Sequence, residues 1–413
     1  KKIYIIGGGL SGLSAACYLR DTFDIELYEG AGQVGGRCRS FFDSKLGIEI
    51  DNGNHIVLSA NSYFLKMCNL IRSENTLNFL GSTYNFFDCK NKNTWNVKIG
   101  ENKFPLWIFN KNSRIPETRL IDYISIFKLL SCNKKMTVKE VIGEKNNLYR
   151  NFWEPLTLGI LNTQCKEASA HLLKNVVKET FLRGGKYSGI FQPKKSWDKT
   201  LINPMLKFLR GKKITPKYHS LLQKITIEKK KVTQLYFKDH TIKINKDELV
   251  IFAIPPNNIA KVFPELQIPQ QFNTIVNVHF KINKKHFKDK PKIIGILNSI
   301  SHWLFLKEDH CSVTLSASNH LENIPKDQLI KKIWYEVSQS LNLDFECPPY
   351  RLIFEKRATY NQSPENNKMV SQLKFSVDNA FLIGDWTEFN FPCSIESSIL
   401  SAKKICDKLA MES

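Results

Sequence analysis

The sequence predicts an α/β fold, with a dinucleotide-binding unit at its N-terminus and a second, discontinuous α+β domain. Residues 3–29 read as an apolar strand, a Gly-rich turn, a helix and a second strand, which is a βαβ beginning. Strand character returns at 222–254, and a final apolar strand at 381–385 precedes a helix over 394–409. A mainly helical region from about 60 to 190 and a mixed region before the last strand interrupt the first domain.

The turn of the first βαβ unit, residues 7–12, fits the pattern G-x-G-x-x-G and opens a helix. Such a helix N-terminus faces its backbone N–H groups toward a phosphate. Glu29 ends the second strand seventeen residues after Gly12, where its carboxylate can accept hydrogen bonds from both ribose hydroxyls and would repel a 2′-phosphate. We therefore predict a Rossmann-like dinucleotide site that disfavours NADP. Its turn residues are Gly7, Gly9, Leu10, Ser11 and Gly12.

Apolar spacing predicts the clearest helix of the middle region over 119–132. The later strand region divides at a Lys-rich turn into 224–227 and 232–237, then 241–244, and ends with a buried-looking strand at 249–254 before two prolines. Cys393 lies before the last helix, and we interpret it as a packed thiol.

The composition of the chain excludes several classes of protein. The chain has 413 residues with 60 Lys+Arg against 39 Asp+Glu, a net charge of +21, and 42% hydrophobic residues, which excludes wholesale disorder. No apolar run approaches the length of a membrane span. The positive charge leaves three interpretations, namely a nucleic acid, an anionic membrane surface or a Lys-rich background. No nucleic-acid motif accompanies it, so we expect no nucleic-acid partner.

The ten cysteines contain no C-x-x-C and no zinc-like spacing, so we expect free thiols in a reducing compartment and no metal. The chain opens directly into a strand, and we therefore expect no signal peptide and a cytoplasmic protein.

Residues 32–37 read G-Q-V-G-G-R, shortly after the acidic residue. This string resembles the extended FAD motif of the flavin amine oxidase and phytoene desaturase superfamily, which has a GR2-type flavoprotein fold. The resemblance implies non-covalently bound FAD, with Gly30 beside the ribose acid, Gly35 and Gly36 allowing close approach, and Arg37 meeting phosphate.

The C-terminal strand and helix fit the same superfamily. Gly384 and Asp385 resemble its second FAD contact, where the Asp meets the ribityl or pyrophosphate region. Ser394 and Ile395 would then point helix N-terminal amides at the flavin, which stabilises an anionic reduced form. Leu222 falls where a residue lies against adenine.

Three further strings resemble the hydroxysqualene dehydroxylases, also called squalene-associated FAD-dependent desaturases. They are D-N-G-N-H at 51–55, F-W-E-P-L at 152–156 with N-T and A-S following, and G-D-W-T at 384–387 with S-I-E-S from 394. The resemblance runs from the first strand to the last helix. It implies bacterial squalene and hopanoid synthesis, in which hydroxysqualene is reduced to squalene. It also places Gly53 and Asn54 along the flavin.

The implied reaction protonates an allylic hydroxyl, releases water and delivers hydride from flavin N5 to the cation. Two residues are candidates for the acid. His55 would lie near the flavin and changes charge near neutral pH. Glu154 lies in an apolar segment, where burial would raise the pKa of its carboxyl and keep it protonated.

A hydrocarbon substrate also needs apolar walls, for which Trp153 and Trp303 are candidates. The aromatic and basic string at 104–109, with Lys111 and Arg114, and the helix at 119–132 could lie at a membrane interface or form core. We expect peripheral contact with the inner face of the cell membrane. An electron donor for FAD is required and is not identified by the sequence.

Two alternatives stay open from the sequence. One is a carotenoid (phytoene-type) desaturase or a flavin amine oxidase, and the other is a non-catalytic prenyl-lipid-binding protein of the same fold. For the flavoenzyme that we favour, we expect an FAD-binding domain of residues 1–60, 190–260 and 365–413. A substrate domain would comprise 61–189 and 261–364.

Overall fold

The computed structural model describes residues 1–101, 106–111, 114–145 and 147–411. The segment that begins at the N-terminus contributes to a parallel four-stranded sheet in the order β19-β13-β1-β2. The register pairs Ile5 of β1 with Leu27 of β2 on one side and with Ile251 of β13 on the other. The four strands span Lys2–Ile6 (β1), Asp24–Tyr28 (β2), Leu249–Phe252 (β13) and Ala380–Leu382 (β19). Three segments far apart in the chain therefore build one sheet, as expected.

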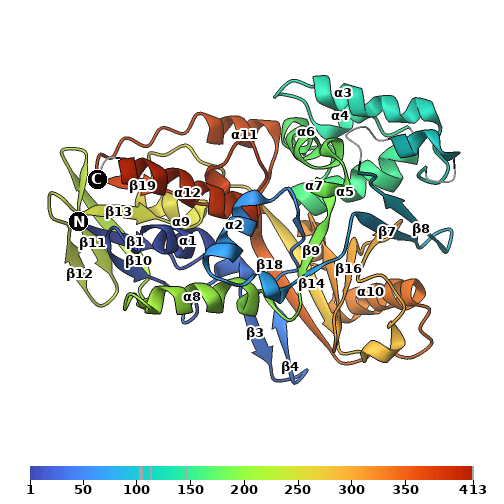
Figure 1. The fold of residues 1–413 in the computed structure, drawn as a ribbon, viewed down its shortest axis with the longest axis horizontal. Coiled ribbons are helices and arrows are strands. Elements are labelled where there is room, and N and C mark those ends of the chain that lie inside the picture. Colours follow the sequence, from blue (N-terminus) through green and yellow to red (C-terminus); the bar gives the residue numbers. More distant parts are fainter. Residues whose placement is uncertain (102–105, 112–113, 146, 412–413) are drawn as a thin grey trace.

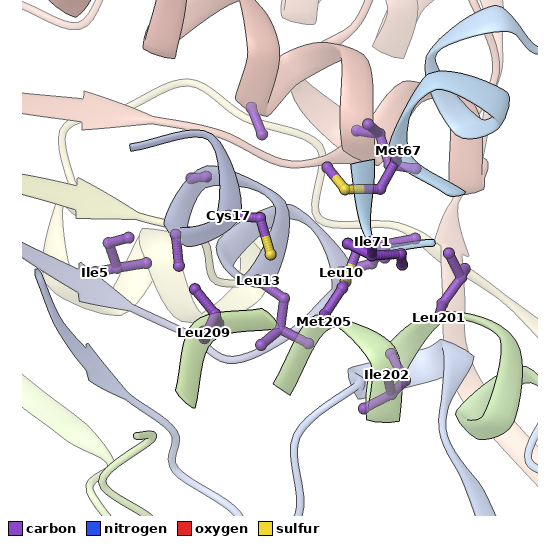
Figure 2. Close-up of a cluster of buried hydrophobic side chains, with 14 of the residues drawn as sticks. Ile5, Leu10, Leu13, Cys17, Met67, Ile71, Leu201, Ile202, Met205 and Leu209 are labelled. Atoms are coloured by element: carbon purple, nitrogen blue, oxygen red, sulfur yellow. The ribbon is translucent and has the colours of Figure 1, made fainter. Parts of the chain in front are cut away.

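Helices cover one face of this sheet and form a core (Figures 1 and 2). Apolar residues of α1, Leu10–Leu19, pack against α12, Ile395–Met411, and against α8, Asn203–Arg210. Figure 2 shows Leu13 and Cys17 of α1 beside Met205 and Leu209 of α8. Small residues such as Ala15 and Ala16 allow the close approach of α12. The rigid core holds the start of α1, and thus the Gly-rich turn, in place.

The opposite face packs on a small antiparallel sheet of Leu222–Glu228 (β10), Lys231–Phe237 (β11) and Thr241–Lys243 (β12). Tyr28 and Phe237 stack there with ring centroids 4.9 Å apart. These strands match the sequence prediction.

A seven-stranded sheet in the order β18-β14-β17-β16-β15-β7-β8 forms the second large layer. Its strands are Thr83–Asp88 (β7), Asn93–Lys98 (β8), Phe272–Phe280 (β14), Ile293–Leu297 (β15), Trp303–Leu306 (β16), Cys311–Leu315 (β17) and Tyr350–Tyr360 (β18). One face buries apolar residues under α10, Lys326–Leu341. The prediction of a mainly helical region up to 190 was wrong at 83–98, where Tyr84, Phe86 and Val97 alternate with polar residues and form a hairpin.

Helices of residues 120–188 form a lobe at the upper right of Figure 1. The helix expected at 119–132 is a 3-10 turn over Leu120–Ile124 followed by α3, Ser125–Ser131. The other helices are Ser62–Leu70 (α2), Val138–Ile142 (α4), Glu154–Leu161 (α5), Ala170–Glu179 (α6), Gly185–Ser188 (α7), Pro256–Val262 (α9) and Pro364–Ser371 (α11). Short strands complete the fold at Ser40–Asp43 (β3), Ile48–Asp51 (β4), Val57–Leu58 (β5), Leu77–Phe79 (β6) and Ile190–Pro193 (β9).

Among the described residues, no helix combines the length and the apolar character needed to cross a bilayer. All ten cysteines are free. The domain boundaries given above stay a prediction.

Candidate functional site

The Gly-rich turn between β1 and α1 has one open position and two packed ones. The N–H of Gly7, at φ +110°, donates to the carbonyl of Tyr28 at 2.8 Å, which ties the turn to β2. A Cβ on Gly12 would lie 1.9 Å from the Gly7 oxygen, so only glycine fits between helix and strand. A Cβ on Gly9 would meet nothing within 4 Å. The space over Gly9 is therefore free for a ligand that approaches the start of α1, where Leu10 and Ser11 follow.

Glu29 follows β2 and faces this turn. Its carboxylate accepts hydrogen bonds from the N–H of Gly8 at 2.7 Å and from the N–H of Ala31 at 2.8 Å. These two bonds fix the carboxylate at the end of the strand, where a ribose is expected in this type of fold.

The second glycine motif packs directly on the first. The Gly35 N–H donates to the Gly8 carbonyl at 2.8 Å, and a Cβ on Gly36 would come within 3.4 Å of the Gly9 Cα. Gly35 and Gly36 have φ values of +101° and +55°, which favour glycine. The chain can therefore turn back over the open position and bring Arg37 to its edge.

Arg37 connects this edge to the C-terminal motif. Its Nη2 donates to Oδ1 of Asp385 at 2.7 Å, and its Nη1 donates to the carbonyl of Ala358. Asp385 is buried, and the preceding Gly384 N–H donates to Ser401 Oγ of α12 at 3.1 Å. The structure thus brings together four segments that the sequence singled out separately.

The start of α12 also lies in this region. Ser394 caps the helix by accepting a hydrogen bond at Oγ from the Ser397 N–H at 3.1 Å, and Ile395 is buried in the core. Glu396, which belongs to the S-I-E-S string, accepts hydrogen bonds from the N–H groups of Tyr63 and Phe64 at 3.0 and 2.8 Å. It therefore caps α2 and fixes that helix against α12.

One position differs from the expectation. Leu222 is buried in the core with Tyr28 and Phe237 instead of lying at an open ligand position. Its neighbour Leu221 is 53% exposed and approaches Gly30, where a Cβ would lie 3.1 Å from Leu221 Cδ1. Adjacent residues at the start of a strand point to opposite sides. The prediction was therefore one residue out, and Leu221 has the open position that was expected for Leu222.

Residues 53–55 link the turns to the seven-stranded sheet. Asn54 Nδ2 donates to Ser312 Oγ at 2.7 Å and to Thr314 Oγ1 at 2.9 Å, both on β17. A Cβ on Gly53 would lie 3.6 Å from His55 Nε2, so the loop is compact. The Oδ1 atom of Asn54 is buried without a hydrogen-bond partner, which leaves one acceptor unused.

His55 lies behind Arg37. Its Nε2 is 3.4 Å from the Arg37 carbonyl oxygen, and its ring meets that of Trp197 edge-on at 6.0 Å. Burial lowers the pKa of His55, although the contact with the Arg37 carbonyl and the charge of Asp51 act against this. The imidazole is consequently neutral at pH 7 in this structure, so it hands on a proton only after taking one up.

A buried ion pair beneath this loop was missed by the sequence. Lys307 Nζ donates to Oδ2 of Asp51, whose Oδ1 accepts Ser40 Oγ at 2.6 Å and the Trp197 N–H at 3.0 Å. The two side chains are 11% and 1% exposed. Burial alone would raise the pKa of Asp51, but the charge of Lys307 and these hydrogen bonds hold it below its ordinary value. The D-N-G-N-H string at 51–55 drew attention to Asp51, but nothing in the sequence indicated that Lys307 would be its partner.

Comparison with known proteins agrees with this geometry. Residues 10–410 match the family of flavin-containing amine oxidoreductases. Hydroxysqualene dehydroxylases from Sinorhizobium fredii and Rhodopseudomonas palustris are 35% and 32% identical, each over 98% of this chain and 98% of the relative. The chain belongs to the hydroxysqualene dehydroxylase family of flavin-containing amine oxidoreductases. It is an oxidoreductase with a flavin cofactor.

A solved structure of similar fold is the cyclohexylamine oxidase from Brevibacterium oxydans, with a TM-score of 0.73. It is 12% identical, and the match covers 100% of this chain and 99% of the other. The shared fold is the α/β flavoprotein architecture that the sequence predicted.

In this dehydroxylase-family chain, the apolar candidates differ in what they contact. Trp153 is 1% exposed, and its Nε1 donates to Ser125 Oγ at 3.1 Å. It is therefore a core residue whose polar atom has a hydrogen-bond partner. Trp303 of β16 has a buried Nε1 without a partner, and a Cβ on Gly159 of α5 would lie 2.7 Å from it. Gly159 is exposed, so Trp303 lies beneath accessible backbone whereas Trp153 does not.

Glu154 is more exposed than expected, although the expected rise in the pKa of its carboxyl is confirmed in direction. Its side chain is exposed at the first turn of α5. Partial desolvation and the nearby charge of Glu144 raise the pKa of its carboxyl, while Arg150 acts against this. The α5 helix turns its apolar residues inward, and Glu154 therefore falls on the outer surface of the lobe.

Proposed function

We propose that this chain is an FAD-dependent hydroxysqualene dehydroxylase that converts hydroxysqualene to squalene. The observation that carries this proposal is the similarity to hydroxysqualene dehydroxylases over nearly the whole length of both chains. The organisation around Gly9 supports it, because the position is open while its neighbours Gly7 and Gly12 are closed by backbone.

FAD fits the residues that surround this opening. Gly9 and the first N–H groups of α1 would hold the pyrophosphate, and Glu29 would accept from the ribose hydroxyls. Arg37, already paired with Asp385, would balance phosphate charge. Leu221 would lie on the adenine side in place of Leu222. Asn54, with its unused buried Oδ1, and the capped start of α12 at Ser394 would lie toward the flavin ring.

Non-covalent binding is supported by the protonation of the thiol that precedes α12. Cys393 precedes α12, and burial raises the pKa of its thiol well above the ordinary value. A thiol that stays protonated is a poor nucleophile. We therefore expect acid precipitation to release all of the FAD into solution.

The reaction needs a proton at the departing hydroxyl. The hydroxyl would accept this proton and leave as water, and reduced flavin, when bound, would supply the hydride that replaces it. His55 is the titratable group placed behind the Arg37 loop, and we propose that it delivers the proton. The charge of Asp51 favours the protonated imidazole, whereas burial and the charges of Arg37 and Lys307 disfavour it. Trp303 would form an apolar wall for the hydrocarbon.

Glu154 is a weaker candidate for the acid. Its side chain is exposed on the lobe, and its charged neighbours are Glu144 and Arg150. We propose that the enzyme works in the cytoplasm, at the membrane that holds its substrate, with an electron donor that reduces its FAD.

The proposal is tested with purified, FAD-loaded chain. The oxidised protein should show a flavin absorption spectrum. Chemical reduction under anaerobic conditions should then yield one squalene per flavin from hydroxysqualene in detergent. Absence of squalene from a fully reduced preparation would contradict the substrate. Oxidation of an amine or desaturation of a polyene by the oxidised enzyme would favour the alternative activities of this superfamily.

A further inference from the structure

The helical lobe carries a cluster of exposed apolar side chains. Of the fourteen large apolar side chains that are exposed in the described part of the chain, five lie between residues 109 and 127, far more than an even distribution would place there. Phe127 is 70% exposed, Phe109 64% and Ile121 61%, and Ile124 and Leu120 are 45% and 44% exposed. We call these five residues the apolar face.

The apolar face is continuous because of helical spacing. Ile121, Ile124 and Phe127 follow one another at intervals of three residues along the 3-10 turn and α3, and Leu120 lies four residues before Ile124, so the four side chains share one side. The turn that contains Phe109 packs against the same 3-10 segment.

The opposite side of this segment is already buried. Tyr123 and Leu129 are 3% and 0% exposed, and Ile126 packs against the core of the lobe. The segment is thus apolar on both sides. An apolar helix surface that remains exposed marks a contact with another apolar phase.

A basic groove adjoins the apolar face. It has a volume of about 830 Å³ and is lined by five basic and two acidic side chains. Arg119 and Lys128, both exposed, flank the apolar face directly. Lys139, Lys145 and Lys166 line the rest of the groove.

We propose that the apolar face and the basic groove together dock on the surface of an anionic lipid bilayer. Apolar side chains would enter the headgroup region while the neighbouring Lys and Arg side chains contact lipid phosphates. A second copy of the chain fits less well, because it would bring two basic grooves and two chains of net charge +21 together. A bilayer supplies both the apolar phase and the opposite charge. The biological reason rests on the proposed function, since a dehydroxylase of this kind draws its hydrocarbon substrate from membranes.

The test compares two matched double variants of the full-length, FAD-loaded protein. Ile121→Ser/Phe127→Ser removes the two side chains at 61% and 70% exposure, and Phe42→Ser/Tyr335→Ser removes a pair at 68% and 59% exposure elsewhere. Partitioning is measured by flotation with phosphatidylcholine vesicles that contain about 30 mol% phosphatidylglycerol. We expect the first variant to bind about tenfold or more weakly than the parent and the second to bind like the parent.

The charge contribution is tested separately. Arg119→Glu/Lys128→Glu should also weaken binding, and the parent should bind less tightly in about 0.5 M salt or on pure phosphatidylcholine. Equal vesicle binding by the parent and the Ile121→Ser/Phe127→Ser variant would overturn the proposal. So would a parent dimer that this variant converts to monomer.

Turnover of hydroxysqualene in detergent should be the same for the parent and these variants, because the substitutions are outside the site. Loss of vesicle binding with normal detergent turnover would support the docking face. Absence of turnover in every form would instead contradict the proposed function and leave the vesicle result standing.

Discussion

Arg37 and Asp385 form an ion pair with a separation of 2.7 Å between Nη2 and Oδ1, although 348 positions separate them in the chain. The pair joins the loop after β2 to the loop after β19. The Asp385 carboxylate is almost fully buried, whereas the Arg37 side chain is 36% exposed. The pair therefore holds these two loops together, and in the proposed cofactor site we expect Arg37 to meet phosphate.

Asp385→Asn should weaken both the fold and the cofactor site. The substitution leaves Arg37 without its charged partner at a half-buried position, and we expect a loss of about 1–3 kcal/mol in the free energy of unfolding. FAD affinity should fall in parallel. Urea denaturation and flavin titration measure the two effects. The exposed pair Lys403–Asp407 provides the control, since Asp407→Asn should cost no more than about 0.5 kcal/mol. Equal losses for the two variants would contradict a special role for the Arg37 pair.

Two substitutions in the glycine turn separate an effect on FAD binding from an effect on folding. Gly9→Ala adds a methyl group where nothing lies within 4 Å, so the flavin-free protein should melt within about 2 °C of the parent. The same methyl group would occupy the space proposed for the pyrophosphate, and FAD should bind at least about tenfold more weakly. Gly12→Ala should instead lower the melting temperature of the flavin-free protein, because its Cβ would lie 1.9 Å from the Gly7 oxygen. Thermal melts with and without FAD distinguish the two variants. Unchanged FAD binding by Gly9→Ala would show that Gly9 does not contact the cofactor.

The sequence predicted the nucleotide-binding elements because local rules determine them. The strand at 3–6, the turn at 7–12 and the helix at 394–409 each carry their own periodicity or glycine pattern. Glu29 could be placed for the same reason, since its distance from the turn is set within one βαβ unit.

Other features depend on contacts between distant segments. Lys307 pairs with Asp51, and Glu396 caps α2, because folding brings these segments together, and no local spacing encodes either contact. Leu221 and Leu222 are adjacent, so only the strand's register decides which one is buried. The hairpin at 83–98 was missed because many residues of its strands are polar and its turn is rich in Asn and Lys without glycine.

Lys307→Met should destabilise the protein strongly and reverse its pH dependence. In the parent, the lowered pKa of Asp51 contributes stability above pH about 4, and this is lost as pH falls through the folded-state pKa. Without Lys307, burial raises the pKa of Asp51, so the carboxylate is buried without a partner at neutral pH. We expect a loss of about 3–5 kcal/mol near pH 7.

The loss in this variant should shrink as pH falls toward 5, because protonation neutralises Asp51. Asp51→Asn combined with Lys307→Met should recover part of the stability, which a double-mutant cycle measures. Lys284→Met, at an exposed pair with Glu308, is the matched control. A pH-independent loss in Lys307→Met would show that the pair does not control the ionisation of Asp51.

The pH dependence of turnover tests His55 as the proton donor. A general acid must be protonated to act, so the single-turnover rate should fall as pH rises through its pKa. Burial lowers the pKa of His55 below its ordinary value of about 6.5, so the rate should be highest in mildly acidic solution and decline before pH 7. His55→Gln should lower the rate by about 10²–10⁴-fold and remove this decline, whereas FAD binding should change little. Glu154→Gln is the comparison, because its exposed side chain should leave both rate and profile near those of the parent. A His55→Gln enzyme that keeps the parent's profile would assign His55 to a hydrogen-bonding role behind Arg37 and return the search for the acid to the neighbouring buried groups.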